Sequence, residues 1–343
     1  MATMLDHQVG WIPESTWNTP PTVTRFGEWM PGNGMDFDPN VVQGKGLRVG
    51  SQVLRAGRRV GLVGQGTGKL QFEMASKGFG TMLTSCWGTS ISNLVSGSTY
   101  QQVHTPVVSG TFLPSLAVQL GIVKPGGTVD PYTYGGCSVT DFDLEMPDGG
   151  IAMLTVSLDA RSLATATALA TASYPSAPTL YNSALPVTGG MTIGGTLTAP
   201  TTTALASVAG GTSVNVKSWK LSVKNGLDLK RDVIGGRNQP VVGVRSISLT
   251  TVIEYDAVTG TTLRDAHIGQ TVNPILLNAT TGESLSTGTA QMQLALPAAY
   301  TNKGPIPVPA DGKMVTTSID WEILDNLTLT PAYHVFRTAD TVL

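Results

Sequence analysis

The feature that most constrains the fold is an alternation of apolar and polar residues in the second half of the chain. In residues 219–223, 246–255, 291–296 and 318–323, apolar side chains recur at every second position, and the positions between them are mostly Ser, Thr, Gln or charged. Because side chains of a strand alternate between its two faces, this pattern predicts antiparallel strands with one buried and one solvated face. The predicted core residues are Trp219, Leu221, Val223, Ile247, Leu249, Ile253, Leu294 and Trp321.

The first half shows a similar series of strands, interrupted by one short helix. Residues 70–74 alternate after a glycine-rich turn, and 147–150 (Pro-Asp-Gly-Gly) is typical of a β-hairpin. Apolar residues between Phe79 and Cys86 recur at the spacing of one helical face, which predicts a helix near 76–88. Further strands are predicted over 115–120, 138–146 and 151–158, and a second short helix over 261–268.

Composition divides the chain into four stretches. Residues 1–45 are predicted to be an extended arm, because their prolines remove backbone donors and fit neither a helix nor a central strand. Residues 46–160 and 216–343 form the two halves of one β-domain. Residues 161–215, rich in Ala, Thr, Ser, Gly and Pro, are either an outer insertion or a flexible linker between the halves.

The arm carries Trp11, Trp17 and Trp29, half of the 6 tryptophans of the chain. Large aromatic side chains in an irregular segment need a surface that covers them. Two arrangements meet this need: the arm folds back on its own domain, or it docks on a neighbouring subunit.

Composition also argues against several classes of function. Only 13% of the 343 residues are charged, and 21 basic against 23 acidic side chains give a net charge of −2, without the clustered basic excess of a nucleic-acid-binding domain. Such weak self-repulsion favours packing against copies of the same chain. Two cysteines, Cys86 and Cys137, are too few for a disulfide framework and indicate a reducing compartment. No secretory signal is expected, and no membrane-spanning segment is expected because no apolar run approaches about 18 residues.

No catalytic, metal or cofactor site is predicted, and we expect the protein not to be an enzyme. The segment 64–69 (Gly-Gln-Gly-Thr-Gly-Lys) departs from the phosphate-loop pattern at Val63 and Leu70 and is interpreted as a glycine hairpin. His104 and Cys137 lack a third orienting group for nucleophilic catalysis. The four histidines show no metal-ligand spacing, and residues 36–40 lack the glycine and the final Glu of a calcium loop.

An ordered series of segments resembles the tail tube (major tail) proteins of long-tailed bacteriophages. The resemblance covers roughly residues 40–340 and depends on the order and spacing of these segments. They are Leu70–Glu73, the helix Gly78–Leu83 ending near Trp87-Gly88, Tyr100 and His104, Ser115–Gln119, Tyr134–Val139, Tyr174-Pro175, Val216–Gly226 and Arg245–Thr250.

The resemblance implies a mainly β protein with an antiparallel β-sandwich or barrel-like tail tube fold, a short flanking helix and long loops. In that family, subunits close into hexameric rings that stack into a hollow tail, through which DNA passes transiently and without sequence-specific binding. The implied partners are other copies of the chain, the tape measure, the tail terminator and the tail tip, with no membrane. The implied location is the virion tail, assembled in the cytoplasm of the host bacterium.

Contacts between subunits are predicted for the arm and for the loop over 45–68. The residues expected to make them are Trp11, Trp17, Trp29, Lys45, Gly64, Gly66 and Gly68. Three alternatives stay open at this point: another structural virion protein of the baseplate or capsid surface, a β-sandwich adhesin or binding module, and a β-rich hydrolase. Hollow tubes of the purified protein would distinguish the tail tube from all three.

Overall fold

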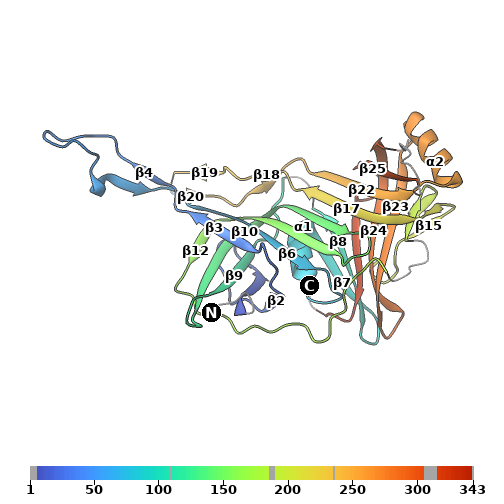
Figure 1. The fold of residues 1–343 in the computed structure, drawn as a ribbon, viewed down its shortest axis with the longest axis horizontal. Coiled ribbons are helices and arrows are strands. Elements are labelled where there is room, and N and C mark those ends of the chain that lie inside the picture. Colours follow the sequence, from blue (N-terminus) through green and yellow to red (C-terminus); the bar gives the residue numbers. More distant parts are fainter. Residues whose placement is uncertain (1–5, 108–109, 185–189, 235, 305–314, 342–343) are drawn as a thin grey trace.

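The computed structural model of this protein describes residues 6–107, 110–184, 190–234, 236–304 and 315–341 (Figure 1). Most of these residues lie in antiparallel strands, accompanied by two α-helices and one short 3-10 turn. The predicted fold class, a mainly β protein with antiparallel sheets and a short helix, is confirmed.

The central sheet contains strands from both halves of the chain. From one edge to the other its order is β3 (Gly34–Asp38), β6 (Gln65–Glu73), β11 (Met153–Ala160), β10 (Val129–Met146), β17 (Val216–Lys224), β22 (Ser246–Glu254), β25 (Thr316–Ile323) and β24 (Thr289–Lys303). The hairpin predicted at 147–150 joins β10 to β11 and is confirmed. The halves meet where β10 pairs with β17, with Phe142 opposite Val223. They therefore share one sheet.

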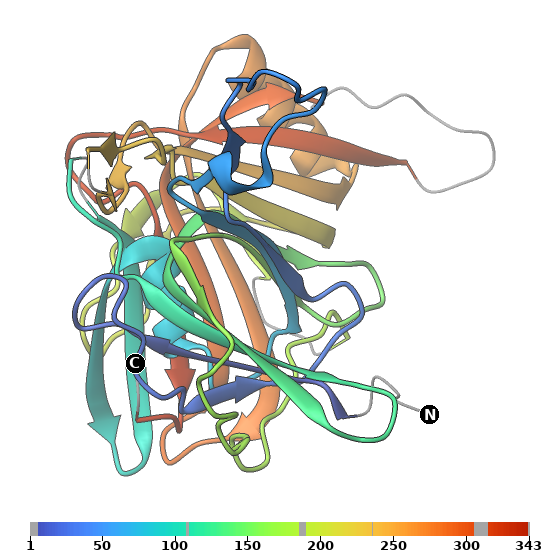
Figure 2. The same cartoon turned by 90° about the vertical axis from the view of Figure 1, so that its left-hand side faces the viewer.

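Strand β24 continues from the central sheet into a second sheet (Figure 2). Its residues 299–303 pair with β25, whereas residues 291–295 pair with β26. The order of the second sheet is β16 (Thr212–Val214), β13 (Met191–Ile193), β23 (Asn273–Ser284), β24, β26 (Tyr333–Thr338), β8 (Thr99–Pro106) and β7 (Gly88–Ser96). Side chains from both sheets contribute to one buried cluster, so the two sheets form a sandwich.

Strand β10 is shared in a similar way with a third sheet. That sheet has the order β12 (Ser162–Ala164), β10, β9 (Leu116–Val123), β1 (Gln8–Pro13) and β2 (Arg25–Gly27). The expectation that residues 1–45 contain no central strand is therefore wrong, since β1 is paired on both sides. The prolines permit this because Pro13 is the last residue of β1, and Pro20 and Pro21 lie between β1 and β2.

The two helices occupy different environments. Helix α1 (Gly80–Trp87) is almost entirely buried, and Gly88 ends it in the left-handed conformation with φ of 103°, after which the chain enters β7. The helix predicted near 76–88 is confirmed. Helix α2 (Ala257–Ile268) begins before the predicted 261–268, and its Leu263 belongs to the buried cluster of the sandwich.

Four two-stranded hairpins decorate this body. They are β4 (Val41–Gln43) with β5 (Arg59–Gly61), β14 (Thr196–Thr198) with β15 (Ser207–Ala209), β18 (Leu227–Asp228) with β21 (Val241–Val242), and β19 (Asp232–Val233) with β20 (Gly236–Arg237). A 3-10 turn at Ala56–Arg58 precedes β5.

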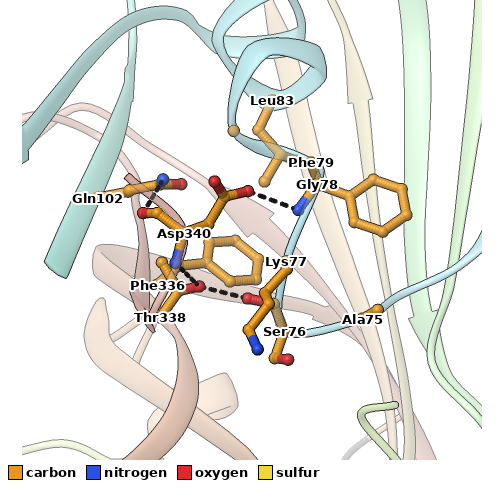
Figure 3. A pocket seen from close by; sticks show the side chains of 11 residues that line it. Ala75, Ser76, Lys77, Gly78, Phe79, Leu83, Gln102, Phe336, Thr338 and Asp340 are labelled. Carbon is orange, nitrogen blue, oxygen red and sulfur yellow. Dashed lines mark hydrogen bonds between the residues drawn. The ribbon is translucent and has the colours of Figure 1, made fainter. Parts of the chain in front are cut away.

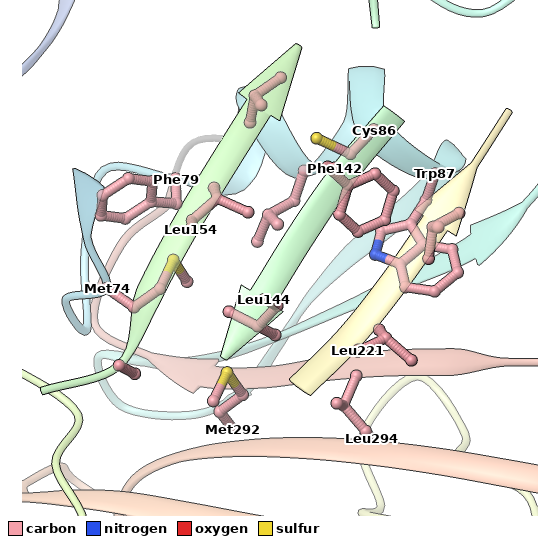
Figure 4. Packing of buried hydrophobic residues seen from close by; sticks show 14 of the residues in the cluster. Met74, Phe79, Cys86, Trp87, Phe142, Leu144, Leu154, Leu221, Met292 and Leu294 are labelled. Carbon is pink, nitrogen blue, oxygen red and sulfur yellow. The ribbon is translucent and has the colours of Figure 1, made fainter. Parts of the chain in front are cut away.

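The core lies between the two sheets, with α1 inserted on one side (Figure 4). Trp87 of the helix packs edge-on against Phe142 of β10, with ring centroids 5.1 Å apart. The structure buries all eight residues named as core from the alternating pattern. Trp321 in addition donates from Nε1 to Thr251 Oγ1 at 2.9 Å, so its polar atom is satisfied inside the core.

Strand β24 departs from the expected alternation, because both of its faces are covered. Gln293 is only 4% exposed and Ala295 is fully buried, although the pattern assigns them to a solvated face. The hairpin β14–β15 and its loop cover this face, and Ala206 exchanges hydrogen bonds with the Gln293 side chain. Part of the segment 161–215 is thus packed on the second sheet, which the local pattern of β24 cannot reveal.

Candidate functional site

The most exposed part of the molecule is a projection formed by residues 41–63. It contains β4, the 3-10 turn and β5, and it extends away from the body between β3 and β6 (Figure 1). Its hydrogen bonds are mainly internal, such as that from Gly44 N to Arg58 O at 2.8 Å. The large apolar side chains that it exposes are Val41, Val42, Leu47, Val49, Val53, Leu54, Val60 and Leu62. Clustered exposed apolar side chains of this kind mark a surface that another molecule covers.

The projection is also the most basic segment of the chain. Its charged residues are Lys45, Arg48, Arg55, Arg58 and Arg59, with no acidic residue among them. This amounts to +5, so the rest of the chain carries −7, given the total of −2. Of these five, only Lys45 is among the contact residues predicted from the sequence, although an all-basic segment with apolar residues out of strand alternation is a detectable signal.

Three glycines hold the base of the projection against β3. A Cβ atom at Gly64 would lie 2.6 Å from Phe37 Cζ, and one at Gly68 would lie 2.5 Å from the carbonyl oxygen of Gly34. At Gly66 the nearest atom would be Ala160 Cβ at 2.9 Å. A side chain at any of the three positions would therefore collide with its own subunit. The expected inter-subunit contacts of these glycines stay a prediction. The role of the three glycines here is to let two strands approach closely.

The three tryptophans of the first 45 residues lie in different environments. Trp11 is 1% exposed, and its Nε1 donates to Thr81 Oγ1 at 3.1 Å, so the expected contact of Trp11 with a neighbour is corrected to a contact within its own core. Trp17 is half-buried beside Gly136. Trp29 is also half-buried, and its ring centroid lies 5.1 Å from that of His7.

A polar face covers the outer side of the central sheet from β6 to β25. We define it by three rows of paired residues that run across the strands. The rows are Glu73, Met153, Glu145, Lys220, Thr250 and Asp320; Gln71, Thr155, Asp143, Ser222, Ser248 and Glu322; and Lys69, Ser157, Asp141, Lys224 and Ser246. Six of these residues are acidic and three are basic, so the face has a net charge of −3. The alternation of apolar and polar residues predicts solvated strand faces but not the register that brings them together.

Hydrogen bonds fix several charged groups of the polar face. Lys220 Nζ lies 2.9 Å from Asp143 Oδ2, and this hydrogen bond raises the pKa of Lys220. Ser157 donates to Asp141 Oδ1 at 2.7 Å, and Thr250 donates to Asp320 Oδ1 at 2.9 Å. The face is therefore an ordered layer of carboxylates and hydroxyls.

The two residues considered for nucleophilic chemistry are both buried. His104 is opposite His334 on neighbouring strands, with ring centroids 6.3 Å apart, and burial lowers the pKa of His104 to about 3. Trp87 Nε1 donates to His334 Nδ1 at 3.1 Å. Burial raises the pKa of the Cys137 thiol well above its usual value. His104 and Cys137 are both buried, without access to a substrate.

A small hollow beside α1 is filled by the C-terminal segment (Figure 3). Gly78 N donates to Asp340 Oδ2 at 2.8 Å, and Asp340 Oδ1 lies 3.3 Å from Arg25 Nη2. Thr338 donates to the carbonyl oxygen of Ser76. These hydrogen bonds connect the C-terminal segment to the start of α1. The hollow has a volume of about 10 Å³ and no room for a ligand.

Within the described ranges, no group of three or more His, Cys, Asp and Glu side chains could hold a metal ion. In the same part of the chain, no helix is long and apolar enough to cross a bilayer.

The fold and these surfaces define a structural β-sandwich protein whose exposed features are surfaces for contact. Comparison with known families matches residues 4–323 to the phage tail tube proteins, and the chain belongs to that family. It is accordingly a structural component of the virion tail and not an enzyme, and the family implies association with itself and with other tail components. A comparison with curated proteins found no match.

Proposed function

We propose that the protein polymerises into stacked hexameric rings that form the hollow tube of a phage tail, and that DNA passes through this tube during ejection. The observation that carries the proposal is the projection of residues 41–63. Its exposed valines and leucines have no cover in the isolated subunit, and its charge of +5 opposes the −7 of the remaining chain. Identical subunits related by repeated head-to-tail contacts form closed rings or open stacks, according to the rotation between them.

The polar face is our candidate for the lumen wall. Duplex DNA carries about one negative charge per 1.7 Å of its axis, so a basic wall would bind it. The net charge of −3 and the many hydroxyl groups of the polar face favour passage without binding. Strand β3 pairs only with β6 among the described residues, and its free edge is a candidate for lateral contact within a ring.

In this proposal the tube encloses the tape measure, and its two ends contact the tail terminator and the tail tip. Assembly takes place in the cytoplasm of the host bacterium. Trp17, Trp29 and Lys45 stay proposed as residues at subunit contacts, because Lys45 is exposed and the two tryptophans are only partly buried in their own subunit.

Electron microscopy of the purified protein tests the proposal. The wild type should form hollow tubes of uniform diameter at high concentration. Replacing residues 44–58 with Asn-Gly would join β4 to β5 by a two-residue turn, and this variant should fold but stay unassembled. Thermal unfolding measured by circular dichroism is the control for folding. Monomers or isolated particles of the wild type under all conditions would instead favour a decoration protein or a binding module.

A further inference from the structure

An apolar cleft opens on the side of the molecule that carries β2. Its volume is about 440 Å³, and its walls include the rings of Phe26, Trp29, Phe72, Phe79 and Tyr174. Phe26 and Tyr174 meet edge-on, with centroids 6.3 Å apart, so the wall is formed by segments far apart in the sequence. A cleft of this size and composition can receive a few apolar side chains of a partner.

The cleft also carries negative charge. Glu28 and Glu73 line it, and neither carboxylate has an ion-pair partner among the described residues. Lys77, the basic residue of the lining, is held by Glu283, with Nζ and Oε1 2.8 Å apart. The cleft is therefore apolar and acidic, which complements the apolar and basic projection.

The cleft and the projection lie at opposite ends of strand β6. The projection ends where β6 begins at Gln65, whereas Phe72 and Glu73 at the other end of β6 line the cleft. Nine residues at about 3.3 Å each separate the two features by about 30 Å along the strand. In Figure 1 the projection extends to the left at the level of β4, whereas β2, beside the cleft, lies at the lower centre of the molecule.

We propose that the projection of one copy docks in this cleft of a second copy, with its tip, residues 47–55, as the inserted part. The basic and apolar tip lies at one end of β6, and the acidic and apolar cleft lies at the other end. A contact between the tip of one copy and the cleft of the next is therefore heterologous, and it can repeat through a stack of copies in the direction of β6. Val49 and Val53 would be buried against the aromatic wall, and Arg55 would approach Glu28. The inference rests on the proposed tube, for which it identifies the contact between successive copies.

Cross-linking between two differently tagged copies tests this contact. One copy carries Gln52→Cys at the tip, and the other carries Glu28→Cys at the rim of the cleft. The native Cys86 and Cys137 are buried, so they contribute little background. A short bis-maleimide should join the two copies within tubes. Asp148→Cys is the matched control, because Asp148 is exposed in the turn after β10, near the same end of the sheet but outside the cleft.

The outcomes separate the inference from the proposed function. A tip-to-cleft cross-link that is absent from the Asp148→Cys control supports the docking. Tubes in which Gln52→Cys joins Asp148→Cys, or joins neither site, overturn the docking and leave the tube intact. Wild-type protein that never forms tubes overturns both.

Charge reversal gives a second measurement. Glu28→Lys should raise the concentration needed for tube formation about tenfold, because it places a cation opposite the basic tip. Adding Arg55→Glu to the same chain should restore most of the loss, whereas Asp148→Lys should change the threshold less than twofold. A Glu28→Lys protein that assembles like the wild type would contradict the docking.

Discussion

Strand β1 and the projection of residues 41–63 are both apolar segments of the first 65 residues, and the structure gives them opposite roles. Trp11 of β1 is 1% exposed and packs against Phe72 and Phe79. Val49 of the projection is fully exposed and lies outside the buried cluster. The difference teaches that apolar content alone does not distinguish a core strand from an assembly element. What decides is whether the rest of the chain supplies a partner, as β9 and β2 do for β1.

The largest effect on stability should appear when β1 loses Trp11 or is removed. Trp11→Ala should lower the free energy of unfolding by about 3–5 kcal/mol, since it opens a cavity in the core and leaves Thr81 Oγ1 without its donor. Deleting residues 6–30 should prevent folding altogether. Chemical denaturation measures the first effect and circular dichroism the second. A shortened chain that folds but does not polymerise would instead support the hypothesis that residues 1–45 are an arm that docks on a neighbouring subunit.

The junction of body and projection should show the next largest effect. Gly68→Ala would place a Cβ 2.5 Å from the Gly34 carbonyl oxygen and should cost about 1–3 kcal/mol by forcing β3 away from β6. Gly57→Ala is the matched control, because no atom lies within 4 Å of its added Cβ. Equal unfolding free energies for the two variants would show that the close approach of β3 to β6 is not needed.

Acid should weaken the body and leave the projection unaffected. The pKa of His104 is about 3 in the folded protein, below its value of 6.5 when exposed, so the unfolded chain binds the proton first. Stability from this group is present above pH 6.5 and is lost as pH falls toward 3, by about 1.4 kcal/mol per pH unit. His104→Gln should reduce the slope of unfolding free energy between pH 6 and 5 by that amount. An unchanged slope would mean that the His104 ring binds its proton equally well in the folded and the unfolded protein.

The smallest effect on stability is expected within the projection. Val49→Ser combined with Val53→Ser should change the unfolding free energy by less than about 0.5 kcal/mol, because both side chains are exposed. The same variant should form fewer tubes, as counted by electron microscopy. A large loss of stability in the monomer would show that the projection folds back on the body in solution.

Local pattern predicted much of the sandwich. The period-two alternation identified β17, β22 and β25, and the eight core residues taken from the alternation are buried. The helical spacing from Phe79 to Cys86 located α1, and Pro147–Gly150 located a hairpin. These features need only neighbours a few residues apart, so the sequence carries them directly.

The same reasoning failed wherever the partner of a segment is distant in the chain. Gln293 looks like a solvated position until Ala206, 87 residues away, covers it. Trp11 looks unsupported until β9 pairs with β1. The acidic cleft and the register of the polar face also join residues from several strands. No local pattern encodes such pairings, because they depend on which surfaces meet when the chain is closed.

By itself, then, the sequence determined the class of fold, the strands with one buried face, the short helix and the family resemblance. The tertiary structure decided which apolar segments are covered. It buried Trp11, closed the base of the projection around Gly64, Gly66 and Gly68, and left the basic tip without cover. The physical reason is that secondary structure follows from the period of the side chains, whereas burial depends on long-range contacts that no short window of residues contains.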